Sequence, residues 1–244
     1  MRLPIATYGR RDCAQASLFL LGVAGLAAWL PYAAGIPALS LLAILPIFFA
    51  GFVVSFYRDF ERVIPAGAGL VVSPADGTVT DVVEVDERDY LGERALRIGI
   101  FLSPLNVHVN RAPVQGTVEK VVPRPGKMLK AYDPRAIDEN ESVLLGLKTD
   151  EGLKVGVRQV TGALARRIVC AVAPGTKLAK GERYGMIKLG SRTELLVPLS
   201  ARMECSVKVG DKVSGGVSIL GRLPVSGAPS PSAPAAPPPV EAKL

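Results

Sequence analysis

The first part of the chain is an uninterrupted apolar stretch. Residues 13–57 contain no charged side chain, and prolines and a glycine interrupt the stretch at 31–37. This pattern predicts two apolar helices, about 14–30 and 36–54, joined by a turn. The second helix is long enough to cross a bilayer, and the first lies at the short end of the spanning range. A spanning pair and a re-entrant hairpin therefore both fit the pattern.

From about residue 70 the pattern changes to short runs rich in Val and Ile, separated by Gly, Pro and Asp. Such runs predict strands with turns between them, while helical periodicity is short and interrupted. The predicted strands are 69–72, 77–85, 96–102, 116–122, 144–147, 153–160, 168–172, 184–189, 194–197, 205–209 and 217–220. We therefore expect a mainly β fold, a β-rich domain with few short helices, preceded by an N-terminal apolar helical hairpin.

The C-terminal stretch is built mainly of Pro, Ala and Ser and has almost no large apolar residue. Such a composition cannot bury a core, so residues 224–244 are predicted to form a disordered tail. The expected organisation is a membrane-associated helical hairpin with its connector over 1–62, a β-rich domain over 63–223, and this tail.

The net charge of the chain indicates which kind of partner it binds. The 244 residues contain 29 Lys and Arg against 22 Asp and Glu, a net charge of +7, and 49% are hydrophobic. A basic chain with an apolar hairpin favours an anionic membrane surface as partner over nucleic acid. Arg2, Arg10 and Arg11 precede the hairpin, and Arg58 and Arg62 follow it. The positive-inside rule then places both ends in the cytoplasm, and we expect the β-rich domain on the cytoplasmic side of the cell membrane.

Few residues of this chain suit a metal site. Cys13, Cys170 and Cys205 are scattered without metal-binding or disulfide spacing, and His108 is the single histidine. A site built from several His ligands is therefore excluded, and no metal is expected. His108 is also the one imidazole available for proton transfer near neutral pH.

A Gly190–Ser191 peptide bond stands between two apolar runs that predict strands, within residues 184–198. Glycine permits strained backbone conformations, so the Ser191 hydroxyl could lie against the Gly190 carbonyl and attack it. The alternative is an ordinary hairpin turn, because Gly-Ser is a common turn dipeptide. The local string alone favours the turn, and the wider chain has to decide.

Three separated motifs occur together: Ser73-Pro-Ala-Asp-Gly77, Phe101-Leu-Ser-Pro-Leu-Asn-Val-His-Val-Asn-Arg-Ala-Pro113 and Leu189-Gly-Ser-Arg192. Their combination and order resemble the phosphatidylserine decarboxylase family, in its short form, over about residues 56–220. The apolar N-terminus agrees with this resemblance.

The resemblance implies a proenzyme that cuts itself between Gly190 and Ser191, giving a membrane-associated β chain and a short α chain that stay together as a heterodimer. Ser191 would become an N-terminal pyruvoyl group, the covalent cofactor. Its carbonyl would form a Schiff base with the amine of phosphatidylserine and act as the electron sink for decarboxylation to phosphatidylethanolamine and CO₂. No external cofactor would be required.

Self-cleavage needs a base for the Ser191 hydroxyl, and we expect His108 in this role, with the Asp76 carboxylate orienting or polarising it. Without the resemblance, Asp76-Gly77 is a turn before a strand and His108 a buried histidine. Compared with the long form, Asn106 replaces an aspartate, Arg111 a second histidine, and Arg192 a threonine. The role of that second histidine does not transfer to Arg111. Whether His108 serves cleavage, decarboxylation or both stays open, and we favour both.

Two other classes of protein compete with this interpretation. A lipoyl or biotinyl carrier would use Lys188 as its modified residue, but such a lysine stands at an exposed turn, whereas Lys188 lies in an apolar run. A membrane-anchored binding module would leave the first two motifs without a purpose.

Overall fold

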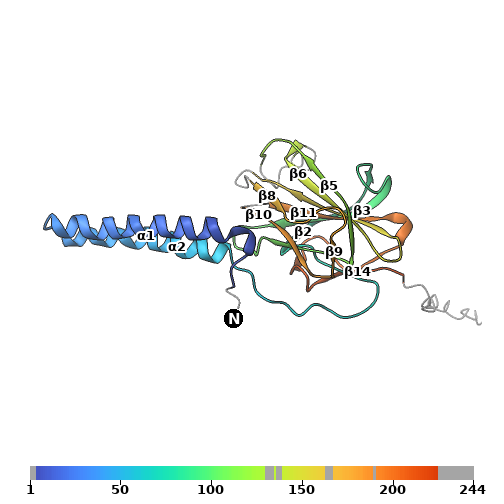
Figure 1. Ribbon diagram of the computed structural model, residues 1–244, viewed down its shortest axis with the longest axis horizontal. Helices are drawn as coiled ribbons and strands as arrows, with labels where there is room; N and C mark the ends of the chain where they lie inside the picture. Colours follow the sequence, from blue (N-terminus) through green and yellow to red (C-terminus); the bar gives the residue numbers. More distant parts are fainter. Residues whose placement is uncertain (1–3, 130–134, 136–138, 163–166, 189–190, 225–244) are drawn as a thin grey trace, which may run out of the picture.

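The computed structural model describes residues 4–129, 135, 139–162, 167–188 and 191–224. A helical hairpin projects from one side of a β-rich body (Figure 1). The prediction of a mainly β fold preceded by an apolar helical hairpin is confirmed. Gly190 and residues 225–244 of the predicted tail lie outside the described residues.

The hairpin consists of α1 (Arg10–Ala33), a 3-10 segment (Pro37–Ala43) and α2 (Ile44–Phe56). The predicted turn at 31–37 begins later than expected, because α1 continues through Pro31. A proline in the last turn of a helix removes one hydrogen bond and leaves the preceding turns intact. The chain reverses at Gly35, whose φ of 74° belongs to the left-handed region that glycine adopts at helix ends.

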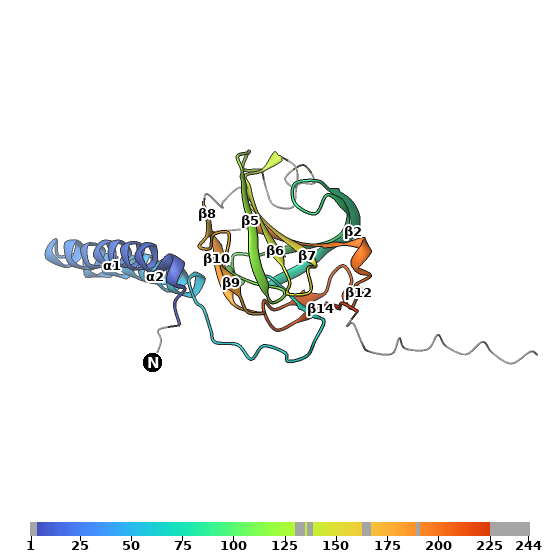
Figure 2. The same ribbon diagram turned by 45° about the vertical axis from the view of Figure 1, so that its right-hand side comes forward.

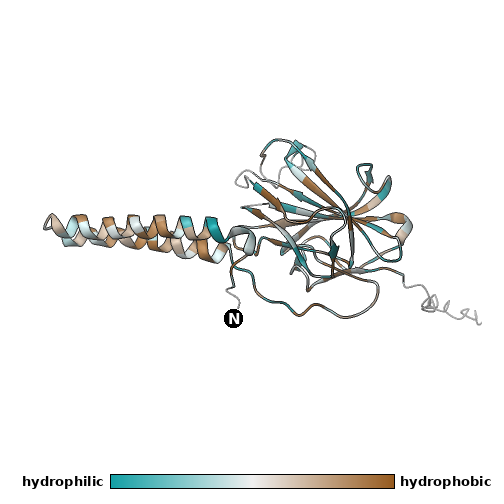
Figure 3. Cartoon of the chain, in the orientation of Figure 1, coloured by the Kyte–Doolittle hydropathy of each residue, from teal (hydrophilic) through white to brown (hydrophobic). Residues whose placement is uncertain are grey.

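Large apolar side chains on the hairpin face outward. Segments Thr7–Ala33 and Pro37–Phe56 are each long and apolar enough to cross a membrane, and Figure 3 shows their hydrophobic colouring along most of both helices. Phe19 and Phe48, for example, are exposed. Uncovered apolar surface of this extent requires an apolar environment, so the hairpin is compatible with membrane association.

The β-rich body contains three antiparallel sheets among the described residues. The strands are β1 (Leu70–Val72), β2 (Gly77–Glu87), β3 (Glu93–Leu102), β4 (Val109–Arg111), β5 (Gly116–Arg124), β6 (Ser142–Lys148), β7 (Lys154–Val160), β8 (Arg167–Cys170), β9 (Lys177–Leu178), β10 (Arg183–Lys188), β11 (Ser191–Pro198), β12 (Glu204–Cys205), β13 (Lys212–Val213) and β14 (Ile219–Arg222). The largest sheet has the order β13-β2-β3-β11-β7-β6-β5-β9. Two three-stranded sheets have the orders β1-β14-β12 and β4-β10-β8.

The large sheet curls around a core to which all three sheets contribute (Figure 2). Val71 of β1, Tyr184 of β10 and Leu195 of β11 belong to this one cluster of buried side chains. Within β11 the side chains alternate, so Ser191 and Thr193 point to the same side as the core residue Leu195. The body thus closes around the beginning of β11.

Most predicted strands coincide with observed ones within a few residues, but three strands were not predicted. These are β4, β9 and β13, which have two or three residues each. Such short segments do not provide a recognisable period-2 pattern. The predicted strand at 205–209 is reduced to its first position, since β12 ends at Cys205.

Candidate active site

Ser191 is the first residue of β11, in the middle of the eight-stranded sheet. It pairs with Leu102 of β3, and the next residue of β11 also pairs with β7. The side chain is fully buried, and its Oγ has no hydrogen-bond partner among the described residues. Buried hydroxyls usually find a partner, so an unpaired one calls for an explanation, such as a chemical task, a bound water or strain.

His108 lies directly before β4, and its ring is also fully buried. Its Nδ1 is 2.9 Å from the backbone carbonyl oxygen of Asn106. A carbonyl oxygen only accepts, so Nδ1 carries the proton and Nε2 of the neutral ring has a free lone pair. Nε2 is buried without a partner in the described part of the chain. This is the tautomer that a general base acting through Nε2 requires.

The pKa of His108 fits the same role. Burial lowers the pKa to about 4, the hydrogen bond to Asn106 opposes this shift, and the positive charge of Arg58 adds to it. The Asp76 carboxylate opposes it as the smallest of these effects. Since burial disfavours the imidazolium ion, the ring is neutral at pH 7 and able to accept a proton.

A closed turn presents the Asn106 carbonyl to the ring. Asn106 Oδ1 accepts hydrogen bonds from the backbone N and from Oγ of Ser103, both at 2.8 Å. The phenyl ring of Phe56, at the end of α2, lies 4.5 Å from the imidazole between ring centroids. The base of the hairpin therefore forms part of the wall around His108.

Two contacts bring the His108 segment to the beginning of β11. The Ile187 backbone N donates to the His108 carbonyl oxygen at 3.2 Å, four residues before Ser191. Asn110 Nδ2 donates to Thr193 Oγ1 at 3.0 Å. Asn110 follows His108 by two residues in sequence, and Thr193 follows Ser191 by two. The segment that carries His108 therefore contacts β11 within two residues of Ser191.

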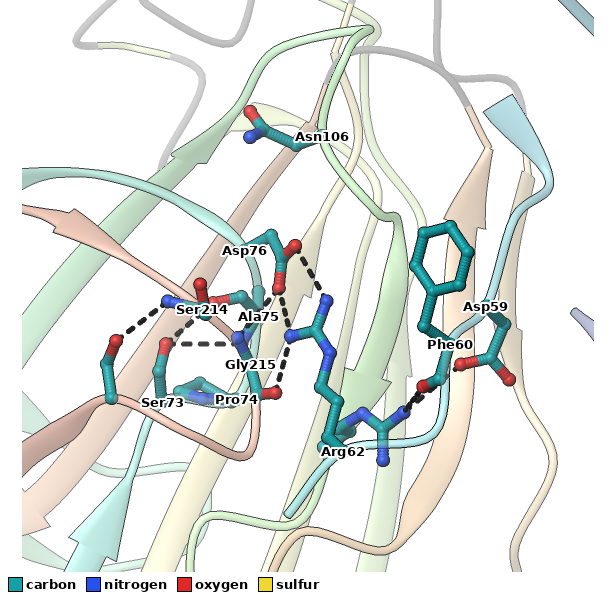
Figure 4. A network of polar contacts seen from close by, with 12 residues as sticks. Asp59, Phe60, Arg62, Ser73, Pro74, Ala75, Asp76, Asn106, Ser214 and Gly215 are labelled. Carbon is teal, nitrogen blue, oxygen red and sulfur yellow. Dashed lines mark hydrogen bonds and ion pairs between the residues drawn. The ribbon is translucent and has the colours of Figure 1, made fainter. Parts of the chain in front are cut away.

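Asp76 occupies a different position from the one expected for a residue that orients His108. Its carboxylate pairs with Arg62, at 2.5 Å from Nη1 and 2.9 Å from Nη2, and accepts from the Gly215 backbone N at 2.7 Å (Figure 4). The hydrogen bond that orients the imidazole comes from Asn106 instead. The direct partners of the Asp76 carboxylate are therefore Arg62 and Gly215, and its effect on the pKa of His108 is the smallest of those named above.

The motif around Asp76 also needs its glycine. A Cβ at Gly77 would lie 2.2 Å from the carbonyl oxygen of Phe101 on β3. No side chain fits at that distance, so only glycine lets the first residue of β2 approach the β3 backbone so closely. The chain continues from β3 into the segment that carries His108.

Arg111, at the place of the second histidine of the long form, is buried and held by an ion pair and by hydrogen bonds to backbone carbonyl groups. Its Nη2 lies 3.1 Å from Asp59 Oδ1, and its other donors reach the Gly181 and Phe60 carbonyl oxygens. Arg183 Nε lies 2.6 Å from Asp59 Oδ2. A buried, permanently charged guanidinium that is bonded on several sides does not act as a base, and here it fixes the connector after α2 to the sheet.

Arg192 points to the face of β11 opposite Ser191. Its Nη2 lies 2.5 Å from Asp81 Oδ2, and its Nε lies 2.8 Å from Glu194 Oε1. The arginine next to Ser191 therefore forms its ion pairs on the face of the sheet opposite Ser191.

Lys188 is the last residue of β10 and forms an ion pair with Asp12 in the first turn of α1. Its side chain is 12% exposed. A carrier lysine has to be accessible to its ligase, so this environment disfavours the carrier interpretation. Within the described residues no group of His, Cys, Asp and Glu could hold a metal ion.

Comparison with known proteins assigns the family. The profile described as "Phosphatidylserine decarboxylase" matches residues 49–221. A "Phosphatidylserine decarboxylase proenzyme" of Symbiobacterium thermophilum is 46% identical over 202 residues, which cover 80% of this chain and 93% of that protein. The chain belongs to the phosphatidylserine decarboxylase family.

Two further proteins with the same printed name support this assignment. The one from Carboxydothermus hydrogenoformans is 48% identical over 172 residues, covering 70% of this chain and 80% of that protein. The one from Rhodopirellula baltica is 40% identical over 222 residues, covering 90% and 88%. The decarboxylase match includes all three motifs and the end of α2, where Phe56 contacts His108.

The structure adds residues to the site that the sequence did not indicate. Phe56 covers the imidazole, Asn106 orients it, and Asn110, Gln159 and Thr193 form a buried hydrogen-bonded group beside it. Alternation could have indicated one of them, because Asn110 follows His108 by two residues and so shares its face in a strand.

Proposed function

We propose that this chain is a proenzyme that cuts itself between Gly190 and Ser191 and then converts phosphatidylserine to phosphatidylethanolamine and CO₂. The observation that carries the proposal is a pair of buried atoms, His108 Nε2 and Ser191 Oγ, that have no hydrogen-bond partner among the described residues and whose chain segments are joined by the Asn110–Thr193 hydrogen bond. A neutral imidazole and a hydroxyl that are both protected from water suit proton transfer between them.

In the proposed cleavage, His108 Nε2 takes the proton of Ser191 Oγ, which attacks the carbonyl carbon of Gly190. The Gly190–Ser191 amide becomes an ester as the Ser191 nitrogen leaves the carbonyl. Elimination then releases residues 1–190 with a C-terminal carboxylate, and hydrolysis of the remaining enamine releases ammonia. Residues 191–244 begin with a pyruvoyl group, so the two chains form one αβ unit.

The residues present fit such a group, because its precursor Ser191 is a fully buried residue whose Oγ has no hydrogen-bond partner among the described residues. The pyruvoyl carbonyl supplies an electron sink for the loss of CO₂ from an amino acid. His108 would again move a proton, since it is the single imidazole of the chain. The Asn106 carbonyl keeps Nδ1 of His108 protonated, and Phe56 keeps water away from the imidazole ring.

A membrane location follows from the same arrangement. We infer that residues 1–62 hold the protein at an anionic leaflet of the cell membrane, with the β-rich domain, 63–223, on the cytoplasmic side. The end of α2 carries Phe56, which contacts His108, so the membrane-associated segment leads directly to the site. A phospholipid substrate could then reach the site without leaving the leaflet.

The test of cleavage is the intact mass of the purified protein. We expect two chains, 1–190 and 191–244, with the second carrying pyruvoyl in place of serine. Ser191→Ala should remain one chain, and Ser200→Ala, a matched change beyond the strand, should be cut normally. A wild-type protein of uncut mass with an intact Ser191 would overturn the proposal.

The test of activity is the release of CO₂ from carboxyl-labelled phosphatidylserine in mixed micelles. The cut wild type should release it, and Ser191→Ala should not. His108→Ala should mature slowly, and its matured fraction should turn over slowly. Full maturation with wild-type turnover in His108→Ala would remove the residue from both steps.

The test of location is flotation with vesicles of phosphatidylcholine, with and without phosphatidylglycerol. We expect the full chain to float with both and more completely with the anionic vesicles, because apolar insertion and basic residues contribute together. A protein lacking residues 1–57 should stay largely in the dense fraction. Equal flotation of the truncated protein would place the membrane contact on the β-rich domain.

A further inference from the structure

We propose that Asn110 is a positioning residue for self-cleavage, which holds the strand of His108 in register with the strand of Ser191. The inference rests on the proposed function and deepens it. Its partners are Thr193 on β11 and Gln159 on β7, and all three residues are fully buried.

Both ends of the Asn110 amide are engaged. Nδ2 donates to Thr193 Oγ1 at 3.0 Å, and Oδ1 accepts from Gln159 Nε2 at 2.8 Å. Because the oxygen end is taken by a donor, the nitrogen end has to face the threonine. Gln159 pairs with Thr193 in the β7–β11 ladder, so the two partners stand side by side in the large sheet. The amide therefore has one orientation and one position along β11.

The contact joins two different sheets. Asn110 belongs to β4 in the β4-β10-β8 sheet, whereas Thr193 and Gln159 belong to the eight-stranded sheet. Among the described residues, the ladder of β4 is with β10 and those of β11 are with β3 and β7, so the Asn110–Thr193 contact links the two sheets directly through side chains. A shift of one step along either strand would separate Asn110 from Thr193 and, under the proposed function, would move the His108 segment relative to Ser191.

Packing alone does not require this polar group. Burying amides and a hydroxyl costs free energy unless all are paired, and apolar side chains of similar volume would fill the space. Gln159 Oε1 has no partner among the described residues, which adds to that cost. The need for a directional contact explains why polar residues stand at these buried positions. A hydrogen bond fixes a distance and an angle, whereas apolar side chains can slide past one another. Proton transfer from Ser191 depends on such precision.

The test compares Thr193→Val, which keeps the shape and removes the acceptor, with Thr193→Ser, which keeps the acceptor and removes a methyl group. Each protein is made by pulse-labelled cell-free translation with vesicles, and the cut fraction is followed over time. We expect Thr193→Val to slow cleavage about tenfold or more and Thr193→Ser to remain within about twofold of wild type. Asn110→Leu should resemble Thr193→Val.

Two further measurements separate positioning from a structural role. The same substitutions are placed in the uncut Ser191→Ala protein, and thermal unfolding is measured. The pH dependence of the cleavage rate is measured for the same substitutions in proteins that retain Ser191 and can therefore cut themselves. Positioning predicts a lower plateau rate for Thr193→Val with its acid limb at the wild-type pH, since His108 stays buried. An acid limb moved to higher pH, or a slow Thr193→Ser with a lowered melting temperature, would show loosened packing and overturn the inference.

Failure of the inference is distinguishable from failure of the proposed function. If the wild type is cut and Thr193→Val is cut at the same rate, Asn110 has no positioning role and the proposed function stands. If the wild type is never cut, the proposed function fails and the inference fails with it.

Discussion

The imidazole of His108 lies 4.5 Å, centroid to centroid, from the phenyl ring of Phe56, with 40° between the ring planes. This contact joins the end of an apolar helix to the residue proposed as the general base. The hairpin therefore contributes to the environment of the His108 ring.

Replacing Phe56 by alanine should admit water to the imidazole and raise the pKa of His108 from about 4 towards its usual value of 6.5. Cleavage needs the neutral ring, so at pH 6 the Phe56→Ala protein should mature about fourfold more slowly than wild type, while at pH 8 the rates should agree. Pulse-labelled translation at both pH values measures this. Phe56→Leu, which keeps an apolar cover, is the control, and an unchanged acid limb in Phe56→Ala would contradict the expectation.

The buried His108 should also make stability depend on pH. Its pKa is lowered in the folded state, so the unfolded chain binds the additional proton as pH falls from about 6.5 to about 4, and stability is lost over that window. The loss should approach about 3 kcal/mol at the acid end. Urea unfolding of the Ser191→Ala protein, with and without His108→Leu, isolates this contribution because other titrating groups are common to both. Parallel pH profiles of the two proteins would show that the ring is not buried.

Asp76 should act through Arg62. Neutralising the carboxylate in Asp76→Asn removes two charge-assisted contacts, and Arg62→Gln removes the same contacts from the other side. We expect both variants to slow maturation by similar factors and the double variant to be no slower than either, because each breaks one shared pair. Slow maturation of Asp76→Asn beside normal maturation of Arg62→Gln would instead assign Asp76 a direct role in the chemistry.

Arg111 should stabilise the fold without taking part in proton transfer. Arg111→Gln leaves Asp59 with a single cationic partner, Arg183, and should lower the free energy of unfolding by about 3 kcal/mol in the Ser191→Ala protein. Arg111→His, which restores the residue of the long form, should not recover it, because an imidazole lacks the donors that reach Gly181 and Phe60. Chemical unfolding measures both, with the exposed Arg124→Gln as control. Equal free energies of unfolding for Arg111→Gln and wild type would show that the Arg111–Asp59 ion pair does not stabilise the fold.

Periodicity was sufficient to predict the fold class, the hairpin and most strands, because these depend on which positions alternate between apolar and polar. It failed at β4, where Val109–Arg111 is too short to alternate recognisably. That strand connects His108 to the core, so the segment most relevant to the chemistry was the one without a local signal.

The site was predictable only as far as motifs extended. Gly190, Ser191, His108 and Asp76 follow from the three motifs, and their roles stay predictions. The partners of Asn110 are not visible in sequence, because Thr193 lies 83 positions away and Gln159 lies 49 positions away. Likewise, the hydrogen bond between His108 Nδ1 and the Asn106 carbonyl oxygen depends on how the 103–106 turn closes, which no spacing rule provides.

The central place of β11 has a consequence for the molecularity of folding. β11 is hydrogen-bonded to β3 on one side and β7 on the other, so a cut before Ser191 would leave β11 between two strands of the other chain. Unfolding the cut protein would then release two molecules, and refolding would become a second-order reaction with a yield that falls on dilution. The uncut Ser191→Ala protein would refold at a rate independent of concentration. The uncut chain would thus fold reversibly, whereas the cut protein would depend on the folding that took place before cleavage.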